Sequence, residues 1–304
     1  MSKSKKVKSA SPKVRKFARE LGTNINEVSG TQRSGRVTEE DIKNFVKSQV
    51  SVNKGKIEKK IDIEEYPHEA FGLVEVKDLP RVKKLSGPQL VKSWTEIPHV
   101  TQHDEIDITE MEQFRTSLID HYTGEKIKIS PLAFVTRAVV NALKKYPNFN
   151  ASLDSQNNKI IFKKYFHIGF AVDTPHGLMV PKIRNVDQLS LREIYEELKR
   201  VSKLCRELKI EKKEFFGGSM TISSLGGIGG NFFTPIINPP EISILGVGKA
   251  FEKIKRVDGK FIIRKMLPIS LSYDHRLIDG AEGARFCVHL GESLGKDFAF
   301  KLAV

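Results

Sequence analysis

Residues 48–73 divide the sequence into two unequal parts, and this division limits the folds that the chain can adopt. The segment is polar, rich in Lys and Glu, and has no sustained hydrophobic periodicity, which is typical of a flexible linker. The sequence therefore predicts a basic tail over residues 1–9, a small domain over residues 10–47 and a large domain over residues 74–304. A chain of 304 residues is long enough for a well-buried core in the large domain.

Positive charge is concentrated at the N-terminal end. The chain carries 51 Lys and Arg against 37 Asp and Glu, and residues 1–60 alone hold 16 against 6. Such a basic module is expected to meet an acidic partner, either a protein or a nucleic acid. Nucleic acid is the less favoured of the two, because the segment has no helix-turn-helix pattern with a clear third helix and no aromatic platform.

Two short helices are predicted in the small domain. Ser11 and Pro12 form a helix start, and Gly22 closes that helix. A second helix is predicted from Thr38 to Lys47, with a capping box between Thr38 and Asp41. The candidate core of this domain is very small and includes valines together with Phe17, Leu21, Ile25, Ile42 and Phe45.

The large domain mixes helices and strands without strict alternation. Hydrophobic periodicity predicts helices over residues 87–97, 109–122, 130–147, 190–210 and 281–295. It predicts strands over residues 99–109, 159–174, 177–183, 219–225, 241–257 and 260–274. This order favours an α/β sandwich built on a mixed sheet.

Several kinds of chemistry are disfavoured by the sequence. His99 and His103 have i, i+4 spacing, but on the predicted strand they would lie roughly 13 Å apart, too far for one metal ion. The segment SLGGIGG lacks the third glycine of a dinucleotide fingerprint. The two cysteines are far apart and indicate no disulfide framework, and no run is long and apolar enough for a membrane span. The N-terminus lacks a secretory signal, so a cytoplasmic setting is expected.

The stretch SYDHRLIDG, beginning at Ser272, is the main candidate for chemistry. Alternation puts Leu271 and Tyr273 on one face of the strand and Ser272 on the other, so His275 follows the strand end. One interpretation makes His275 a general base beside a cleft. The other makes it an ordinary strand end, with Asp279 capping the next helix through a box with Glu282. Spacing alone favours the second interpretation.

The same residues resemble a known family. DHRLIDG is similar to the active-site signature of the dihydrolipoamide acyltransferases of 2-oxo acid dehydrogenase complexes, which are related to chloramphenicol acetyltransferase. TISSLGGIGGNFFTPIINPPEISILGVG and IGFAVDTPHGLMVPKIRNV resemble the same catalytic domain in the same order, and SPKVRKFARELG with GTQRSGRVTEEDI resembles its peripheral-subunit-binding domain. The resemblance implies a chloramphenicol-acetyltransferase-like two-layer sandwich with a mixed sheet, preceded by a small helical domain.

The resemblance also implies a reaction and its residues. The family moves an acyl group between the thiols of dihydrolipoamide and coenzyme A, and it implies no metal. His275 stands at the family's catalytic base, Ser223 at the hydroxyl that stabilises the tetrahedral oxyanion, and Asp279 at the signature acid that holds the loop. The resemblance leaves the contacts of the nucleotide end of coenzyme A unassigned.

Partners and assembly follow from the resemblance as well. Arg15, Lys16, Arg19 and Arg36 match basic positions that bind the pyruvate decarboxylase component or dihydrolipoamide dehydrogenase. The family forms trimers, with active sites between neighbouring subunits, that build a large hollow core. Its usual lipoyl domain is not found in the sequence, so the chain is expected either to be part of a longer one or to receive the lipoyl group from another chain.

The acyl group and the rival functions remain open in part. TISSLGGIGG and DGAEGARF look most like the acetyl-transferring members of bacterial pyruvate dehydrogenase complexes, so an acetyl group is expected. A succinyl- or branched-chain acyltransferase is the alternative within the class. A non-catalytic scaffold that docks partner enzymes is the alternative outside it, and the presence of both His275 and Ser223 argues against it. A chloramphenicol-type acetyltransferase is disfavoured by the small domain.

Overall fold

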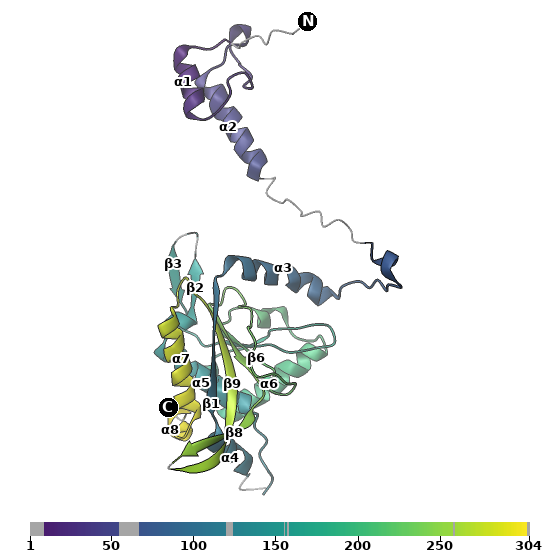
Figure 1. Ribbon diagram of the computed structural model, residues 1–304, viewed down its shortest axis with the longest axis vertical. Helices are drawn as coiled ribbons and strands as arrows, with labels where there is room; N and C mark the ends of the chain where they lie inside the picture. The colour runs from purple at the N-terminus through teal and green to yellow at the C-terminus, as the bar shows by residue number, and fades with distance from the viewer. Residues whose placement is uncertain are drawn as a thin grey trace. The chain divides into compact units, whose positions relative to one another are not determined.

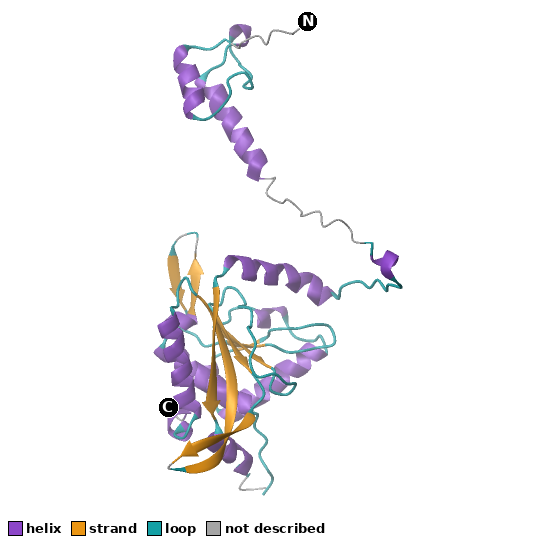
Figure 2. Cartoon of the chain, viewed as in Figure 1, coloured by secondary structure: helices purple, strands orange, loops and turns teal. Residues whose placement is uncertain are grey.

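The structure is a computed structural model that describes residues 9–54, 67–119, 124–154, 156, 158–257 and 259–302. The chain forms two compact units, Met1–Val76 and Lys77–Val304. Figures 1 and 2 show helices in the first unit and both helices and strands in the second. Residues 1–8 of the predicted tail and residues 55–66 of the predicted linker lie outside the described residues.

The first unit is helical, as predicted. Its elements are α1 (Pro12–Glu20), η1 (Arg33–Gly35), α2 (Glu39–Lys54) and η2 (His68–Phe71). The Ser11 hydroxyl accepts the Val14 N–H at 3.3 Å at the start of α1. Thr38 and Asp41 exchange backbone N–H to side-chain hydrogen bonds at 2.9 and 3.2 Å, which confirms the capping box.

Helix α2 continues to Lys54, seven residues beyond the predicted helix and into the predicted linker segment. The unit buries the side chains of Val14, Ala18, Val28, Val37 and Ile42. The expectation for Leu21 is wrong: its side chain is 44% exposed, because Leu21 is the residue that terminates α1.

A seven-stranded mixed sheet organises the second unit, and its strand order is β1-β9-β7-β6-β4-β5 with β8 paired to β9. Strands β4, β6 and β7 run parallel to one another, and the other pairs are antiparallel. The strands of this sheet are β1 (His99–Asp107), β4 (Ile168–Phe170), β5 (Lys182–Ile183), β6 (Met220–Ser224), β7 (Ser243–Val247), β8 (Phe251–Val257) and β9 (Lys260–Asp274). Strands β2 (Ala151–Asp154) and β3 (Lys159–Phe162) form a separate pair.

The helices of this unit form the second layer of the sandwich and its edges. They are α3 (Arg81–Glu96), α4 (Thr109–Ser117), α5 (Pro131–Lys145), α6 (Leu191–Arg206), α7 (Gly280–Leu294) and α8 (Phe298–Leu302), with the short turns η3 (Pro147–Asn150), η4 (Val186–Gln188) and η5 (Lys212–Phe215). Helix α5 packs against both α6 and α7, and its buried residues join those of β9 in one core. In the described part of the chain, no helix has the length and apolar character that crossing a membrane requires.

Two long predicted strands are each split in the structure. Residues 159–174 contain β3 and β4, which belong to different sheets. Residues 241–257 contain β7 and β8, which pair with successive parts of β9 and are separated by residues 248–250, which belong to no strand. Apolar residues lie on both sides of each break, so apolar content alone does not reveal where the chain changes partner.

Both faces of β9 are buried near its end. Leu271 and Tyr273 join the core formed with the helices, as alternation predicts. Ser270 and Ser272 lie on the opposite face and are no more than 1% exposed, because polar side chains of the neighbouring strand β1 cover them. This face of the sheet is therefore a buried polar layer, and the candidate site is built on it.

Candidate active site

An apolar cavity of about 370 Å³ lies beside strand β6, and Ser223 forms part of its wall. Thr221 and Ser223 face the same side of the sheet, because alternate residues of a strand share a face. Most other wall residues are apolar and come from α3, from residues 171–180 and from residues 233–239; they include Leu90, Leu178 and Phe233. A hydroxyl in such a cavity can form hydrogen bonds that are stronger than those in water.

His275 follows the end of β9, in the turn that leads to α7, as predicted. Its backbone N–H donates to the Pro98 carbonyl at 3.1 Å. The next residue, Arg276, holds the buried Asp274 carboxylate with hydrogen bonds of 2.9 and 2.6 Å. The backbone of the turn is thus fixed on both sides, while the residue His275 itself is exposed.

Asp279 is the N-cap of α7. Its Oδ1 accepts the backbone N–H of Glu282 at 2.8 Å, which confirms the cap predicted from the sequence. A carboxylate at this position also interacts favourably with the positive end of the helix dipole. Asp279 therefore fixes the point at which the His275 turn enters the helix.

Ser223 and His275 do not meet within one chain. Ser223 is paired with Gly246 of β7, and Gly246 is paired with Ser270 of β9. Asp274 lies four residues beyond Ser270, which corresponds to roughly 13 Å along a strand, and the two strand spacings add roughly 10 Å sideways. This separation is too large for one reacting atom to contact both side chains of a single copy.

The two histidines of β1 are held by hydrogen bonds to protein groups. His99 Nε2 accepts the Ile237 N–H at 3.0 Å, so Nδ1 carries the proton and donates to the Ile97 carbonyl at 2.8 Å. His103 Nδ1 lies 2.9 Å from the Ser270 hydroxyl. Over the described residues, no group of three or more His, Cys, Asp or Glu side chains could hold a metal ion.

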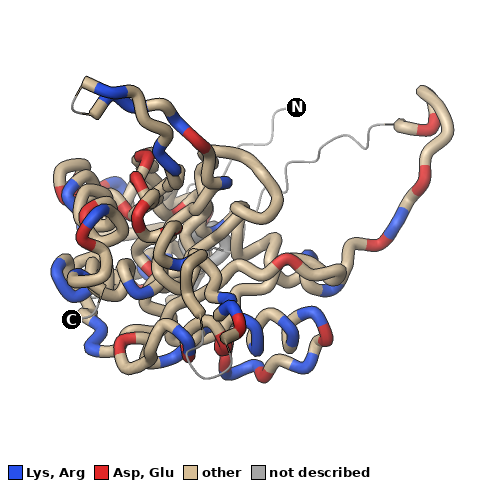
Figure 3. Tube along the Cα trace, turned by 90° about the horizontal axis from the view of Figure 1, so that it is seen from below, with Lys and Arg blue, Asp and Glu red and all other residues tan. Residues whose placement is uncertain are grey.

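A buried charged cluster beside the cavity was not predicted. Charged residues of both signs alternate over the chain in Figure 3, yet the side chains of Lys182 and Glu241 are only 1% exposed and form an ion pair. Thr221 hydrogen bonds to both. The one signal in the sequence is a Glu placed directly before the apolar run of β7. Burial also lowers the pKa of the neighbouring Lys163 to about 8.

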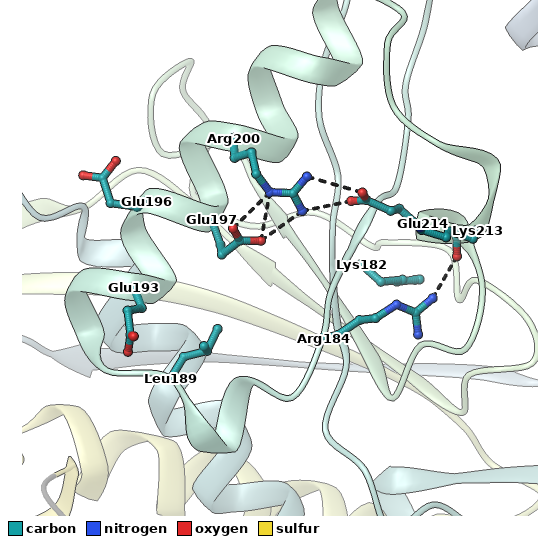
Figure 4. A pocket seen from close by; sticks show the side chains of 9 residues that line it. All are labelled: Lys182, Arg184, Leu189, Glu193, Glu196, Glu197, Arg200, Lys213 and Glu214. Carbon is teal, nitrogen blue, oxygen red and sulfur yellow. Dashed lines mark hydrogen bonds and ion pairs between the residues drawn. The ribbon is translucent and has the colours of Figure 1, made fainter.

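A second cavity, of about 420 Å³, lies along α6 (Figure 4). Its charged groups are largely satisfied by one another. Arg200 forms ion pairs with Glu197 and Glu214, and Arg184 donates to the Lys213 carbonyl at 2.8 Å. This cavity is therefore a less favourable candidate site than the apolar one beside Ser223.

The predicted partner-binding residues lie on the small unit. Arg15, Lys16 and Arg19 belong to α1, where Arg15 and Arg19 share a face by their i, i+4 spacing. Arg36 follows η1, and the bridge between Ala10 and Val37 brings it to the beginning of α1. Lys16, Arg19 and Arg36 are exposed, and Arg15 is half-buried.

The fold and the family matches together identify an acyltransferase core. Residues 72–299 match the model of the 2-oxoacid dehydrogenases acyltransferase (catalytic domain), and residues 9–43 match the e3 binding domain. The chain therefore belongs to the 2-oxoacid dehydrogenase acyltransferase family. The predicted fold class, an α/β sandwich with a mixed sheet preceded by a small helical domain, is confirmed.

Curated relatives share one description. The chain is 47% identical over 301 residues to the dihydrolipoyllysine-residue acetyltransferase component of the pyruvate dehydrogenase complex of Cupriavidus necator, covering 95% of this chain and 54% of the relative. It is 42% identical to the corresponding component of Haemophilus influenzae, covering 94% and 53%. The chain thus spans about half the length of these relatives.

Solved structures of the family are similar to about three quarters of this chain. The Azotobacter vinelandii dihydrolipoamide acetyltransferase is 44% identical, with a TM-score of 0.74, and the match covers 78% of this chain and 97% of that one. That structure accompanies an investigation of a serine, a histidine and an asparagine in the catalytic mechanism. A probable dihydrolipoamide acetyltransferase from Listeria monocytogenes is 28% identical, with a TM-score of 0.68 and coverage of 74% and 95%.

Proposed function

We propose that this chain transfers an acetyl group between the thiol of dihydrolipoamide and coenzyme A, as the core of a pyruvate dehydrogenase complex. The supporting observation is the spacing of three residues along the sequence. The serine, histidine and asparagine studied in the Azotobacter vinelandii enzyme are separated by 52 and 4 positions, and Ser223, His275 and Asp279 have the same separations. The apolar cavity at Ser223 suits an aliphatic thioester arm.

His275 acts as the general base. A thiol has an ordinary pKa of about 8.5 and is mostly protonated at neutral pH. The imidazole accepts the thiol proton as the sulfur attacks the thioester carbonyl carbon, and it returns that proton to the leaving thiolate. The backbone from which the imidazole projects is anchored at Pro98 and Asp274.

Ser223 stabilises the charge that develops on the carbonyl oxygen. Attack by sulfur places negative charge on that oxygen, and the hydroxyl donates a hydrogen bond to it. In the low-polarity cavity this bond is worth more than in water, and loss of one such donor typically lowers the rate roughly 100- to 1,000-fold.

Asp279 holds the geometry of the His275 turn rather than reacting. The corresponding residue in the Azotobacter vinelandii enzyme is an asparagine. Asp and Asn both accept backbone N–H groups well at a helix N-cap, and the carboxylate accepts the Glu282 N–H here. A role in capping therefore accounts for either residue, whereas proton transfer would not.

The active site is formed between two copies of the chain. Ser223 and His275 are too far apart within one copy to share a substrate atom, by the register of β6, β7 and β9. A ring of copies, in which each contributes His275 to one neighbour and Ser223 to the other, satisfies both roles. A related solved structure is the cubic core of a pyruvate dehydrogenase multienzyme complex, which supports assembly into a large core.

The small unit docks the partner enzymes. Its match to the e3 binding domain supports binding of dihydrolipoamide dehydrogenase, and the pyruvate decarboxylase component is the other expected partner. Arg15, Lys16, Arg19 and Arg36 supply positive charge for an acidic surface. The lipoyl group itself is carried on a domain outside this sequence, and the protein acts in the cytoplasm.

The proposal is tested by measuring acetyl transfer from acetyl-CoA to free dihydrolipoamide. His275→Ala at matched oligomeric state is expected to lower kcat by about 100- to 10,000-fold. His289→Ala, on α7, serves as the control histidine. Succinyl-CoA and branched acyl-CoA donors measured in parallel decide the acyl preference. A wild-type protein inert to every donor would show that the chain is a docking scaffold instead.

A further inference from the structure

We infer that Glu241 is a positioning residue for Ser223, and that it acts through a buried contact with Lys182 and Thr221. The inference rests on the proposed acetyl transfer and adds a residue that neither contacts the cavity nor belongs to the signature motif. The cavity is lined by Thr221 and Ser223 but not by Lys182 or Glu241. Any effect of Glu241 on catalysis is therefore indirect.

The side chains of Lys182, Thr221 and Glu241 each hydrogen bond to the other two. The Lys182 ammonium donates to Glu241 Oε1 and, at 3.1 Å, to the Thr221 hydroxyl. The Thr221 hydroxyl donates in turn to Glu241 Oε2 at 2.6 Å. Asn238 approaches Glu241 Oε1 with its amide at 3.4 Å. These bonds fix the orientation of Thr221, which lies two residues before Ser223 on the same face of β6.

A glycine makes this arrangement possible. Lys182 of β5 and Thr221 of β6 are both paired with Gly169 of β4, which lies between them. A Cβ at Gly169 would lie 2.4 Å from Lys182 Nζ and 2.6 Å from the Thr221 hydroxyl. The lysine therefore crosses β4 at the one residue without a side chain and reaches the strand that carries Ser223.

Glu241 also follows the loop segment 233–239, which forms part of the cavity wall. This loop is tied down along its length: Ile237 accepts the Ser93 hydroxyl at 2.6 Å, and Pro240 accepts the Ser152 hydroxyl at 2.6 Å. The Glu241 side chain then joins the loop to β6 through Thr221. The Glu241 carboxylate is thus the bond that joins this loop directly to the Ser223 strand.

Stability alone does not account for the buried charges. Taking an ammonium and a carboxylate out of water carries a large desolvation penalty, and apolar replacements of similar volume are often equally stable. However, directional hydrogen bonds between charged groups restrict the orientation of the side chains more narrowly than apolar packing does. Fixing the Ser223 strand is a role that these charges fulfil and that apolar side chains would not.

A double-mutant cycle tests the inference. Glu241→Gln is expected to lower kcat for acetyl transfer at least 10-fold, and Ser223→Ala to lower it by about 100- to 1,000-fold. The double variant should match Ser223→Ala alone, because Glu241 acts through that hydroxyl. Glu110→Gln, which weakens a half-buried ion pair with Arg264 on strand β9, is the control. Effects that multiply in the double variant, or an unchanged kcat in Glu241→Gln, would overturn the inference.

A second pair of variants covers the case in which Glu241→Gln does not fold. Thr221→Val keeps the shape and removes the hydroxyl, whereas Thr221→Ser keeps the hydroxyl. The inference expects a lower kcat in the first and recovery in the second, with both assembled. A lower melting temperature without a change in kcat would assign a structural role only. A wild-type protein without acetyl transfer would refute the proposed function, and the inference with it.

Discussion

Two inactive variants of this chain should restore each other when they assemble together. The prediction follows from the register of three strands: Ser223 is level with Gly246 and Ser270, and Asp274 lies roughly 13 Å further along β9. One chain therefore cannot supply both Ser223 and His275 to one substrate. Ser223→Ala and His275→Ala each remove one half of every site, and a mixed ring contains sites in which both halves are intact.

The expected activity of the mixture follows from the fraction of sites in which both residues are intact. In a ring, each site takes His275 from one copy and Ser223 from the neighbouring copy. With equal amounts of the two variants mixed at random, half of the copies supply His275 and half supply Ser223, so about a quarter of the sites are complete. The mixture should reach about a quarter of the wild-type kcat, although each variant alone retains about 1% or less.

The assay is acetyl transfer by co-expressed chains that carry different affinity tags, with assemblies of every composition retained and the ratio of the two tags measured. A mixture of His275→Ala with the Ser223→Ala/His275→Ala double variant is the matched control, because no site in it receives a histidine. Activity equal to the mean of the two single variants would refute the reasoning, since it would mean that each site lies within one copy.

Three further predictions follow from other parts of the structure. Gly248→Ala should lower the free energy of unfolding by about 1–3 kcal/mol in chemical denaturation, because its Cβ would lie 2.1 Å from the Asn231 carbonyl oxygen. Gly227→Ala, in the segment between β6 and β7, has open space and should not. Burial lowers the pKa of Lys163 from 10.5 to about 8. The folded state therefore binds fewer protons than the unfolded state between these values, and wild-type stability relative to Lys163→Met should rise from pH 8 to 10. Arg19→Glu should weaken binding of dihydrolipoamide dehydrogenase in surface plasmon resonance, most strongly at low salt; equal affinity at every salt concentration would exclude Arg19 from the interface.

Local sequence patterns identified the helix starts that carry a side-chain cap, whereas α3 has no such cap and begins at Arg81, six residues before the predicted Gly87. Ser11, Thr38 and Asp279 each cap a helix through a bond to a residue three positions away. Such a contact depends on a few neighbouring residues and is readable from spacing. The same holds for His275, whose place after β9 follows from the alternation that precedes it.

Local patterns did not predict the points at which an apolar segment is divided into two strands. Residues 241–257 were predicted as one strand, yet the chain leaves the strand at residues 248–250 between β7 and β8. Likewise, Ser270 and Ser272 alternate with apolar residues as if they faced water, and the structure buries them against β1. Alternation reports that two faces differ, but it does not report what covers each face.

The sequence by itself determined the helix caps, the strand that ends at His275 and, through its motifs, the family to which the chain belongs. Tertiary structure decided which distant residues meet. Lys182 and Glu241 pair although 59 positions separate them, and Ser223 and His275 stand apart although both belong to the site. The physical reason is that strand order and register set these distances, and both arise from packing of the whole sheet rather than from the periodicity of any one segment.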